Sequence, residues 1–584
     1  MKFWKTVLAV IVGILLASII SCILTFGFFG ALSGGSTPAV PKEGVLKVDM
    51  SKISLVEQVQ PTTDPRVLFG GAEYTPLSLW DAVQAIRAAA ADPGVKFIYL
   101  KADGMMASLP QAEEFRVALE GFHDSGKAII AYTETPSTGS YYLASVADKI
   151  YMSSISGAGP QITGVSTTMF FLKDILDRLG VNVQLIRHGK YKSAGEMYIR
   201  NSASPENLEQ NQAMIDSMWD SIRSAIEQSR GINGLDAMID NLELLNAKDM
   251  LAKGLVDEIV SKEELRSKIA VLSGEDSFKN VTFIPFADYA EAKAATAPKT
   301  GAKVAVIYAE GNIVEGDAPQ AIAGDRYASL IADVRADESV KAVVLRVASP
   351  GGSVTASDKI KQEIDLLRKV KPVIASYGAY AASGGYWISN SCDHIFTDKT
   401  TLTGSIGVFS MIPDVSKTVK DVLHVGVNTV SSNKHGSFGN MLRPLDKDET
   451  AYMQASVEEI YSDFVATVAQ GRELSPSYVD EIAQGRVWTG AESVGLKLTD
   501  DIGTLEDAVR YAAAAAGLDS WHVQAYPAPM TTLEMMMAMM QKVGTDKDVL
   551  AGTPFESVGR AFSGWSFEKG ERFFARMPYE YVIK

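Results

Sequence analysis

One serine lies in a setting suited to nucleophilic chemistry. Ser383 belongs to the run AASGG at 381–385, where a predicted strand gives way to a predicted helix. This resembles a nucleophile elbow, in which the N–H after the serine and the helix N-terminus face a reacting carbonyl. One strand earlier, the turn SPGGS at 349–353 offers glycines whose N–H groups can approach a ligand closely. The two motifs lie one strand–helix–strand step apart. Together they predict one site with a serine nucleophile.

A serine nucleophile needs a general base, and the sequence offers no evident Asp/His partner. His394 follows Ser383 closely but begins the predicted strand 395–397, which favours an ordinary histidine at a sheet edge. A lysine is the alternative base, effective only when burial lowers its pKa by disfavouring the charged amine.

The elements that must position these residues alternate between strands and helices. The runs 304–308 and 342–347 are apolar and β-branched along their length, as expected for strands covered on both faces. Apolar residues recur at helical spacing within 356–370, and another strand follows at 373–377. This order predicts right-handed crossovers and a mostly parallel sheet in an α/β fold.

The chain repeats itself at a fixed offset of 245 residues, which predicts two copies of one α/β unit. The first copy has Thr138 where the second has Ser383, and GMMAS at 104–108 where the second has SPGGS. The nucleophile elbow therefore survives only in the second copy. The matching pairs are Ala91/Ala336, Asp92/Asp337, Val95/Val340, Lys96/Lys341, Leu100/Leu345, Gly139/Gly384, Tyr141/Tyr386, Asp148/Asp393, Ile150/Ile395 and Gly159/Gly404.

The N-terminal segment has the length and apolar character of a membrane anchor. The apolar run 7–29 is long enough to cross the roughly 30 Å hydrocarbon core as one helix. A cleaved signal peptide usually has a shorter apolar region, so we expect an uncleaved transmembrane helix within 1–32. Lys2 and Lys5 precede the run, which places the leading segment in the cytoplasm and the body across the membrane.

Composition narrows the class of protein further. A chain of 584 residues with 47% hydrophobic and 21% charged residues indicates more than one globular domain. The net charge of −15 disfavours nucleic acid as a partner. Two cysteines exclude a disulfide framework, and the six histidines show no metal-ligand spacing, so we expect neither metal nor cofactor.

Four motifs together resemble one family. SPGGS at 349–353, AASGGYWIS at 381–389, TLTGSIGV at 401–408 and KYKSA at 190–194 are similar to signal peptide peptidases of the SppA type (peptidase family S49), in their long duplicated form. The similarity runs from about Val45 to about Pro527 and implies two tandem domains related to the Clp protease and crotonase folds.

The resemblance also implies roles for individual residues. Ser383 is the implied nucleophile, Lys192 the general base with Lys190 as its competitor, and Ser405 a hydroxyl that holds the lysine amine. Gly352 and Gly384 are the implied oxyanion N–H donors. Because the second copy has no counterpart of KYKSA, each copy keeps half of a Ser/Lys dyad, and we expect the site where the two copies meet.

These observations set the expected organisation and function. The expected segments are an anchor at 1–32, a linker at 33–44, a lysine-bearing domain at 45–291, a linker at 292–302, a serine-bearing domain at 303–527 and a Met-rich extension at 528–584. We expect a serine endopeptidase, anchored in the bacterial inner membrane and facing the periplasm, that degrades cleaved signal peptides and other short hydrophobic peptides. The resemblance implies a homo-tetramer. Two alternatives stay open: a non-catalytic membrane scaffold, and a crotonase-like acyl-CoA enzyme.

Overall fold

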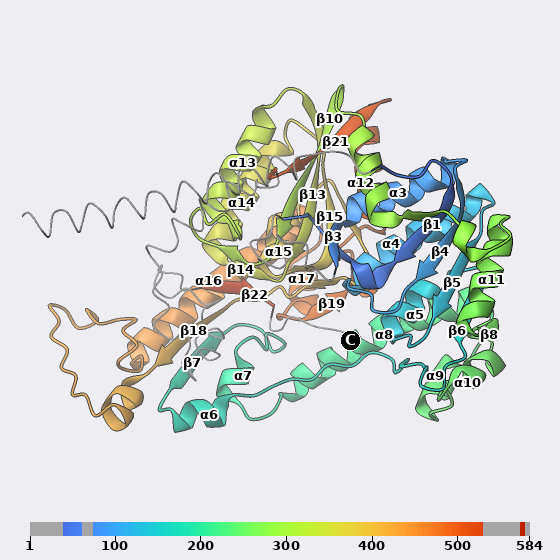
Figure 1. The fold of residues 1–584 in the computed structure, drawn as a ribbon. Helices are drawn as coiled ribbons and strands as arrows, with labels where there is room; N and C mark the ends of the chain where they lie inside the picture. The colour runs from blue at the N-terminus through green and yellow to red at the C-terminus, as the bar shows by residue number, and fades with distance from the viewer. Residues whose placement is uncertain (1–38, 61–73, 529–572, 578–584) are drawn as a thin grey trace, which may run out of the picture.

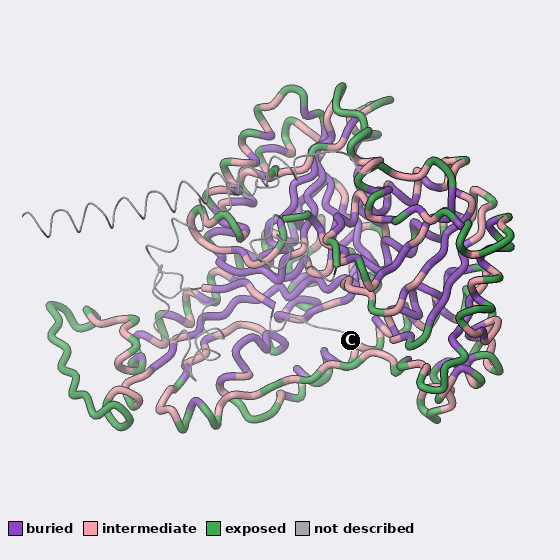
Figure 2. Tube along the Cα trace, viewed as in Figure 1, coloured by how far each residue is buried: buried purple, intermediate pink, exposed green. Residues whose placement is uncertain are grey.

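The described part of the chain, residues 39–60, 74–528 and 573–577, forms two large sheets, a mixed third sheet and a two-stranded pair in this computed structural model (Figure 1). Both large sheets are buried between helices, as the burial colours in Figure 2 show. The two-stranded pair joins β2 (Ile53–Val56) to β3 (Thr75–Ser78).

The first large sheet is parallel throughout, in the order β8-β6-β5-β4-β1-β9. Helices α3, α4, α5 and α12 pack on one face, and α11 packs on the other. The strands are β1 (Gly44–Asp49), β4 (Val95–Lys101), β5 (Ile129–Thr133), β6 (Lys149–Ser153), β8 (Glu258–Val260) and β9 (Phe283–Pro285); the helices are α3 (Leu79–Ala91), α4 (Leu109–Phe122), α5 (Thr138–Ala144), α11 (Lys262–Ser273) and α12 (Phe286–Thr296).

The second large sheet has the order β19-β17-β15-β13-β10-β21, with β16 beside β15 and β20 beside β16. All its pairs are parallel except β17 with β19. Its strands are β10 (Ala302–Glu310), β13 (Val340–Ser349), β15 (Val373–Ala382), β16 (His394–Thr397), β17 (Leu402–Gly404), β19 (Val487–Thr489), β20 (Asp501–Ile502) and β21 (Trp521–Tyr526). Helices α13 (Gly324–Ala336), α14 (Val354–Leu367), α15 (Gly384–Ser389) and α16 (Lys447–Gly471) cover one face, and α19 (Leu505–Ala515) covers the other.

The two large sheets and their helices confirm the predicted duplication. Helix α13 begins and ends 245 residues after α3, and α14 does the same relative to α4. The expected linker at 292–302 is shorter than predicted, because α12 continues to Thr296. The alanine-rich stretch that reads as a linker also has high helix propensity, which explains the difference.

The third sheet brings distant parts of the chain together, in the order β12-β11-β14-β22-β18-β7. Its β7 comes from the first copy and pairs antiparallel with β18 of the second copy, beside the second large sheet (Figure 1). Part of the expected Met-rich extension also belongs to this sheet, since β22 lies between β14 and β18. The strands are β7 (Asn182–Arg187), β11 (Ile313–Val314), β12 (Ile322–Ala323), β14 (Gly351–Ser353), β18 (Phe409–Asp414) and β22 (Phe574–Arg576).

A buried ion cluster joins the two copies. Arg346 on β13 has a side chain that is 1% exposed, and it contacts two carboxylates of the first copy, Glu57 and Glu114. Glu113, next to Glu114, accepts the backbone N–H groups of Lys399 and Thr400 in the second copy. Buried charges of this kind require their partners, so the cluster fixes how the copies sit against each other.

The expected anchor at 1–32 and the methionine-rich stretch near residue 537 lie outside the described residues. Among the residues that are described, no helix combines the length and the apolar character needed to span a membrane.

The remaining helices lie at the edges of this framework. They are α6 (Lys173–Arg178), α7 (Glu196–Ile199), α8 (Pro205–Arg230), α9 (Leu235–Asp240), α10 (Ala247–Ala252), α17 (Pro476–Ile482) and α18 (Gly490–Gly495). The long α8 runs between the first large sheet and the third sheet, along the lower side of the molecule in Figure 1.

Candidate active site

Ser383 lies at a sharp turn between β15 and α15. Its backbone has φ 55° and ψ −111°, a conformation that non-glycine residues rarely adopt. The Ser383 N–H donates to the carbonyl of Gly404 at 2.8 Å, which helps to hold this turn. The sequence-predicted elbow is therefore present, and its serine is completely buried.

Lys192 reaches the same point from the first copy. Its Nζ lies 2.8 Å from Ser383 Oγ, 3.0 Å from Ser405 Oγ and 3.0 Å from the Ser405 carbonyl oxygen. Ser405 also has a positive φ of 50°, and its N–H donates to the carbonyl of Arg486. The structure thus brings together the lysine and both serines named from the sequence.

The environment of Lys192 favours its neutral form. The side chain is 0% exposed, and burial lowers the pKa of the Lys192 amine well below its usual range. No carboxylate of the described residues forms an ion pair with this amine, so nothing there offsets the cost of burying its charge. A neutral amine can accept the Ser383 hydroxyl proton.

The loop after β7 holds Lys192 through its backbone. Arg187 Nη1 donates to the Lys192 carbonyl at 2.6 Å and to the buried carboxylate of Glu196 at 3.2 Å. Gln210 on α8 donates to the carbonyl of Tyr191 at 3.0 Å. These bonds lie within the first copy, whereas the Tyr191 N–H donates to the Gln484 carbonyl of the second copy at 2.9 Å.

Two glycines of the second copy make room for the lysine, a role that no sequence pattern predicts. A methyl group placed on Gly485 would lie 2.5 Å from Lys192 Cβ, and one on Gly407 would lie 3.2 Å from Lys192 Cδ. Gly407 falls in the TLTGSIGV motif, but Gly485 belongs to no motif. Its role depends on contact between segments almost 300 residues apart, which no local pattern encodes.

The two glycines expected to donate to an oxyanion lie close to the serine. Gly352 is the central residue of β14, and Gly384 is the first residue of α15, directly after Ser383. A methyl group on Gly384 would lie 3.1 Å from Gly351 Cα, so the SPGGS turn and the elbow are in contact. The two motifs therefore lie side by side next to the serine.

The other candidates from the sequence lie elsewhere. Lys190 is exposed, with its amine 5.0 Å from the centre of the Tyr191 ring. His394 pairs with Asp501 at 3.0 Å and stacks on Tyr511. Thr138, the first-copy counterpart of Ser383, donates to the carbonyl of Gly164 at 3.1 Å.

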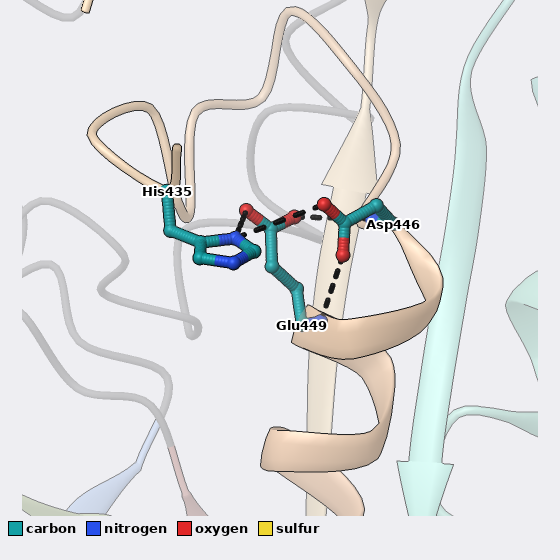
Figure 3. Close-up of side chains that lie close together, drawn as sticks. All are labelled: His435, Asp446 and Glu449. Carbon is teal, nitrogen blue, oxygen red and sulfur yellow. Dashed lines mark hydrogen bonds and ion pairs between the residues drawn. The ribbon is translucent and has the colours of Figure 1, made fainter. Parts of the chain in front are cut away.

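His435, Asp446 and Glu449 form a separate cluster at the N-terminus of α16 (Figure 3). The Glu449 carboxylate accepts two hydrogen bonds from Arg443, at 2.6 and 2.8 Å, which lower the pKa of Glu449 to about 2. Asp446 caps the helix by accepting the Glu449 N–H at 2.9 Å. Because the guanidinium already neutralises the Glu449 carboxylate and Asp446 caps the helix, we interpret the cluster as a helix cap with ion pairs.

Comparison with known proteins gives consistent matches. Residues 121–275 and 365–519 each match the family described as Peptidase family S49. "Protease 4" of Salmonella typhi is 36% identical over 541 residues, which cover 88% of this chain and 85% of that protein. "Serine protease SPPA, chloroplastic" of Arabidopsis thaliana is 29% identical, covering 82% of this chain and 71% of that protein. Among solved structures, a mutant ClpP1 from Listeria monocytogenes is matched at 12% identity with a TM-score of 0.24, over 35% of this chain and 94% of that one.

Proposed function

Because the chain belongs to peptidase family S49, in its tandem duplicated form, and is a serine protease, we propose that Ser383 and Lys192 are its catalytic dyad. The observation that carries this proposal is the 2.8 Å distance between Lys192 Nζ and Ser383 Oγ in a fully buried setting. Burial lowers the pKa of the amine and so favours the neutral form that a general base needs.

The proposed reaction follows from these contacts. Lys192 accepts the Ser383 hydroxyl proton as Oγ attacks the peptide carbonyl, and the amine then protonates the departing nitrogen. Water activated by the same amine hydrolyses the acyl-enzyme. Ser405 Oγ lies 3.0 Å from Nζ. It orients the amine and does not itself attack the peptide carbonyl.

Backbone N–H groups supply the electrostatic part of the mechanism. We assign the oxyanion site to Gly352 and Gly384, whose segments touch beside the serine. Fixed donors of this kind act without reorganisation as negative charge develops, and removing one donor typically costs about 10²–10³-fold in turnover.

The proposed substrates are short hydrophobic peptides, including cleaved signal peptides. We further propose a homo-oligomer, a tetramer by resemblance, in the bacterial inner membrane with its body on the periplasmic side. The apolar run at 7–29 supports anchoring. Alkaline carbonate extraction of the full chain and of a chain lacking 1–32 tests the membrane anchoring. The full chain should stay with the membrane, and the shortened one should not.

A fluorophosphonate probe tests the dyad directly. Wild type should be labelled on Ser383, Ser383→Ala should not be labelled, and the matched control Thr138→Ala should be labelled like wild type. Labelling that survives in Ser383→Ala, or hydrolysis of a hydrophobic reporter peptide by that variant, would overturn the assignment. An acyl-CoA enzyme or a scaffold would not need the buried amine beside Ser383, which is why the peptidase dyad is preferred.

A further inference from the structure

A cavity of about 480 Å³ lies at the seam between the two copies. This seam cavity has walls from α3 of the first copy, from α19 and β21 of the second, and from the end of α12, which leads from one copy to the other. Figure 1 shows α3, α12 and β21 next to one another in the upper part of the molecule. Its volume is within the range of about 300–1,000 Å³ that is usual for small-molecule sites. The lining includes Trp80, Asp81 and Gln84 on α3, Arg510 on α19, and Trp521 and His522 on β21.

Two side chains of the seam cavity have buried polar atoms without a partner. His522 is only 7% exposed, and its Nδ1 has no hydrogen-bond partner among the described residues. The same holds for the amide Nε2 of Gln84. Most buried polar atoms in native proteins are hydrogen-bonded, so each exception calls for an explanation. A ligand in the cavity can pair with both side chains once the ring or the amide has turned about its last bond.

The carboxylate of Asp81 lacks a cation. The Ser78 hydroxyl donates to it at 2.6 Å, and no basic side chain of the described residues forms an ion pair with it. Burial raises the pKa of the Asp81 carboxyl, as expected for a carboxylate without an opposite charge nearby. A ligand with a cationic group would supply the missing charge.

The other charged groups of the seam cavity already have partners, and one of them has donors left over. Glu506 pairs with Arg87 at 3.1 Å and with Arg510 at 2.5 Å, and Lys293 pairs with Asp92 at 2.9 Å. Arg510 uses only Nη2 toward Glu506, and its side chain is 57% exposed. A guanidinium has five N–H donors, so Arg510 can also bind an anionic group of a ligand.

Two tryptophans give the seam cavity an apolar surface. Trp80 and Trp521 come from different copies, and both pack against the apolar cluster beneath α19. Val509 and Val523 line the cavity beside them. Tryptophan rings offer a large apolar area, and their faces also attract cations. The cavity therefore suits a ligand that joins an apolar group to charges of both signs.

We propose that the seam cavity binds a short peptide with free ends and an apolar side chain. The peptide ammonium pairs with Asp81, and its carboxylate accepts from Arg510 and from the Gln84 amide. The apolar side chain packs on Trp80 and Trp521. Peptides of this kind are products of the proposed activity, but their binding here does not need the dyad.

Other ligand classes fit the seam cavity less well. A polyanion such as a nucleotide would meet the carboxylates of Asp81 and Glu506. A simple organic cation would leave the Gln84 amide without an acceptor and would lie near Arg510. A zwitterion satisfies both signs of charge. Because both copies line the cavity, such a ligand also bridges them, and its binding should raise the melting temperature.

Calorimetric titration with the dipeptide Leu-Phe tests the proposal, on the full chain carrying Ser383→Ala so that the probe stays intact. Adding Asp81→Asn should weaken binding at least about tenfold, because a hydrogen bond to a charged group is lost. Asp507→Asn is the matched control, since Asp507 has the same capping position on α19 and does not line the cavity. It should leave the affinity unchanged.

Two outcomes would overturn the proposal. One is equal affinity with and without Asp81→Asn, which would place the dipeptide elsewhere, for instance at the candidate active site. The other is no binding at millimolar dipeptide. Since binding is measured without Ser383, neither outcome bears on the dyad, which hydrolysis of a reporter peptide by wild type tests separately.

Blocked probes and a filled cavity check the recognition of each group. Acetyl-Leu-Phe lacks the ammonium and Leu-Phe amide lacks the carboxylate, so each should bind at least about tenfold more weakly than Leu-Phe. Ala88→Trp adds a large group to the cavity wall and should abolish binding, whereas Ala91→Trp adds it at an exposed position of the same helix and should not. Blocked probes that bind as tightly as Leu-Phe, or binding that survives Ala88→Trp, would contradict the assignment.

Discussion

Lys192 Nζ lies 2.8 Å from Ser383 Oγ, although the two residues are 191 positions apart and belong to different copies of a duplicated unit. The amine has no carboxylate partner among the described residues and contacts only hydroxyl and carbonyl oxygens there. The pair joins an amine whose pKa is lowered by burial to a serine held at a strained turn.

Replacing the two neighbouring lysines should separate their roles. Lys192→Ala should lower kcat/KM by about 10²–10⁴-fold, the usual contribution of a general base. Lys190→Ala should stay near wild type, because that amine is exposed over Tyr191. Steady-state hydrolysis of a reporter peptide measures both. The opposite ranking would transfer the base to Lys190.

Activity should rise with pH on a limb set by Lys192. The base works only when neutral, and burial lowers its pKa, so the limb should be centred below the model-peptide value of about 10.4. The pH profile of kcat/KM reports this pKa for the free enzyme. A limb centred at or above the model-peptide value would contradict the burial of the amine.

The same pKa shift should appear in stability. Between the folded and unfolded pKa values of Lys192, the unfolded chain binds one more proton, so the free energy of unfolding should increase with pH and level off near about 10.4. Lys192→Met should lose this increase in denaturant unfolding measured across that range.

Ser405→Ala should weaken turnover without removing the nucleophile. The hydroxyl lies 3.0 Å from Lys192 Nζ, and its loss leaves the amine held by the Ser405 carbonyl alone at that residue. We expect kcat to fall while a fluorophosphonate still labels Ser383. An adduct on Ser405 in wild type, together with activity in Ser383→Ala, would show that the two serines have exchanged roles.

Gly485→Ala should abolish activity by moving Lys192. The added methyl group would lie 2.6 Å from the Lys192 backbone nitrogen, and the residue has a φ of +77°. Gly517→Ala is the matched control, because its φ is +65° but nothing lies within 4 Å of the added group. Both variants should lose some thermal stability, whereas only Gly485→Ala should lose peptidase activity. Equal activities would show that Gly485 does not position the lysine.

Much of the fold could be predicted from the sequence, because strands buried on both faces read as apolar runs and the repeat shows itself at one offset. The elbow at Ser383 was also visible, since small residues at a strand–helix junction carry a local signal. The place of Lys192 was not visible locally, because it depends on β7 of one copy pairing with β18 of the other. Only the resemblance to the family favours Lys192 over Lys190 as the general base.

Two further features could not be predicted for the same reason, because each depends on contacts between distant parts of the chain. Gly485 matters only through contact with a residue from the other copy. Strand β22 has three residues, too few for any periodicity, and it forms because β14 and β18 leave room for it.

The pairing of β7 with β18 also sets when the enzyme becomes active. Lys192 is synthesised long before Ser383, and Gly485, which packs against the lysine, follows later still. A chain still emerging from the ribosome therefore first holds the proposed base without the proposed nucleophile. It then holds both before Gly485, which packs against the lysine, has been made. On the proposed dyad, peptide-bond cleavage begins only when both copies have folded and docked, so the order of synthesis keeps the nascent chain inactive.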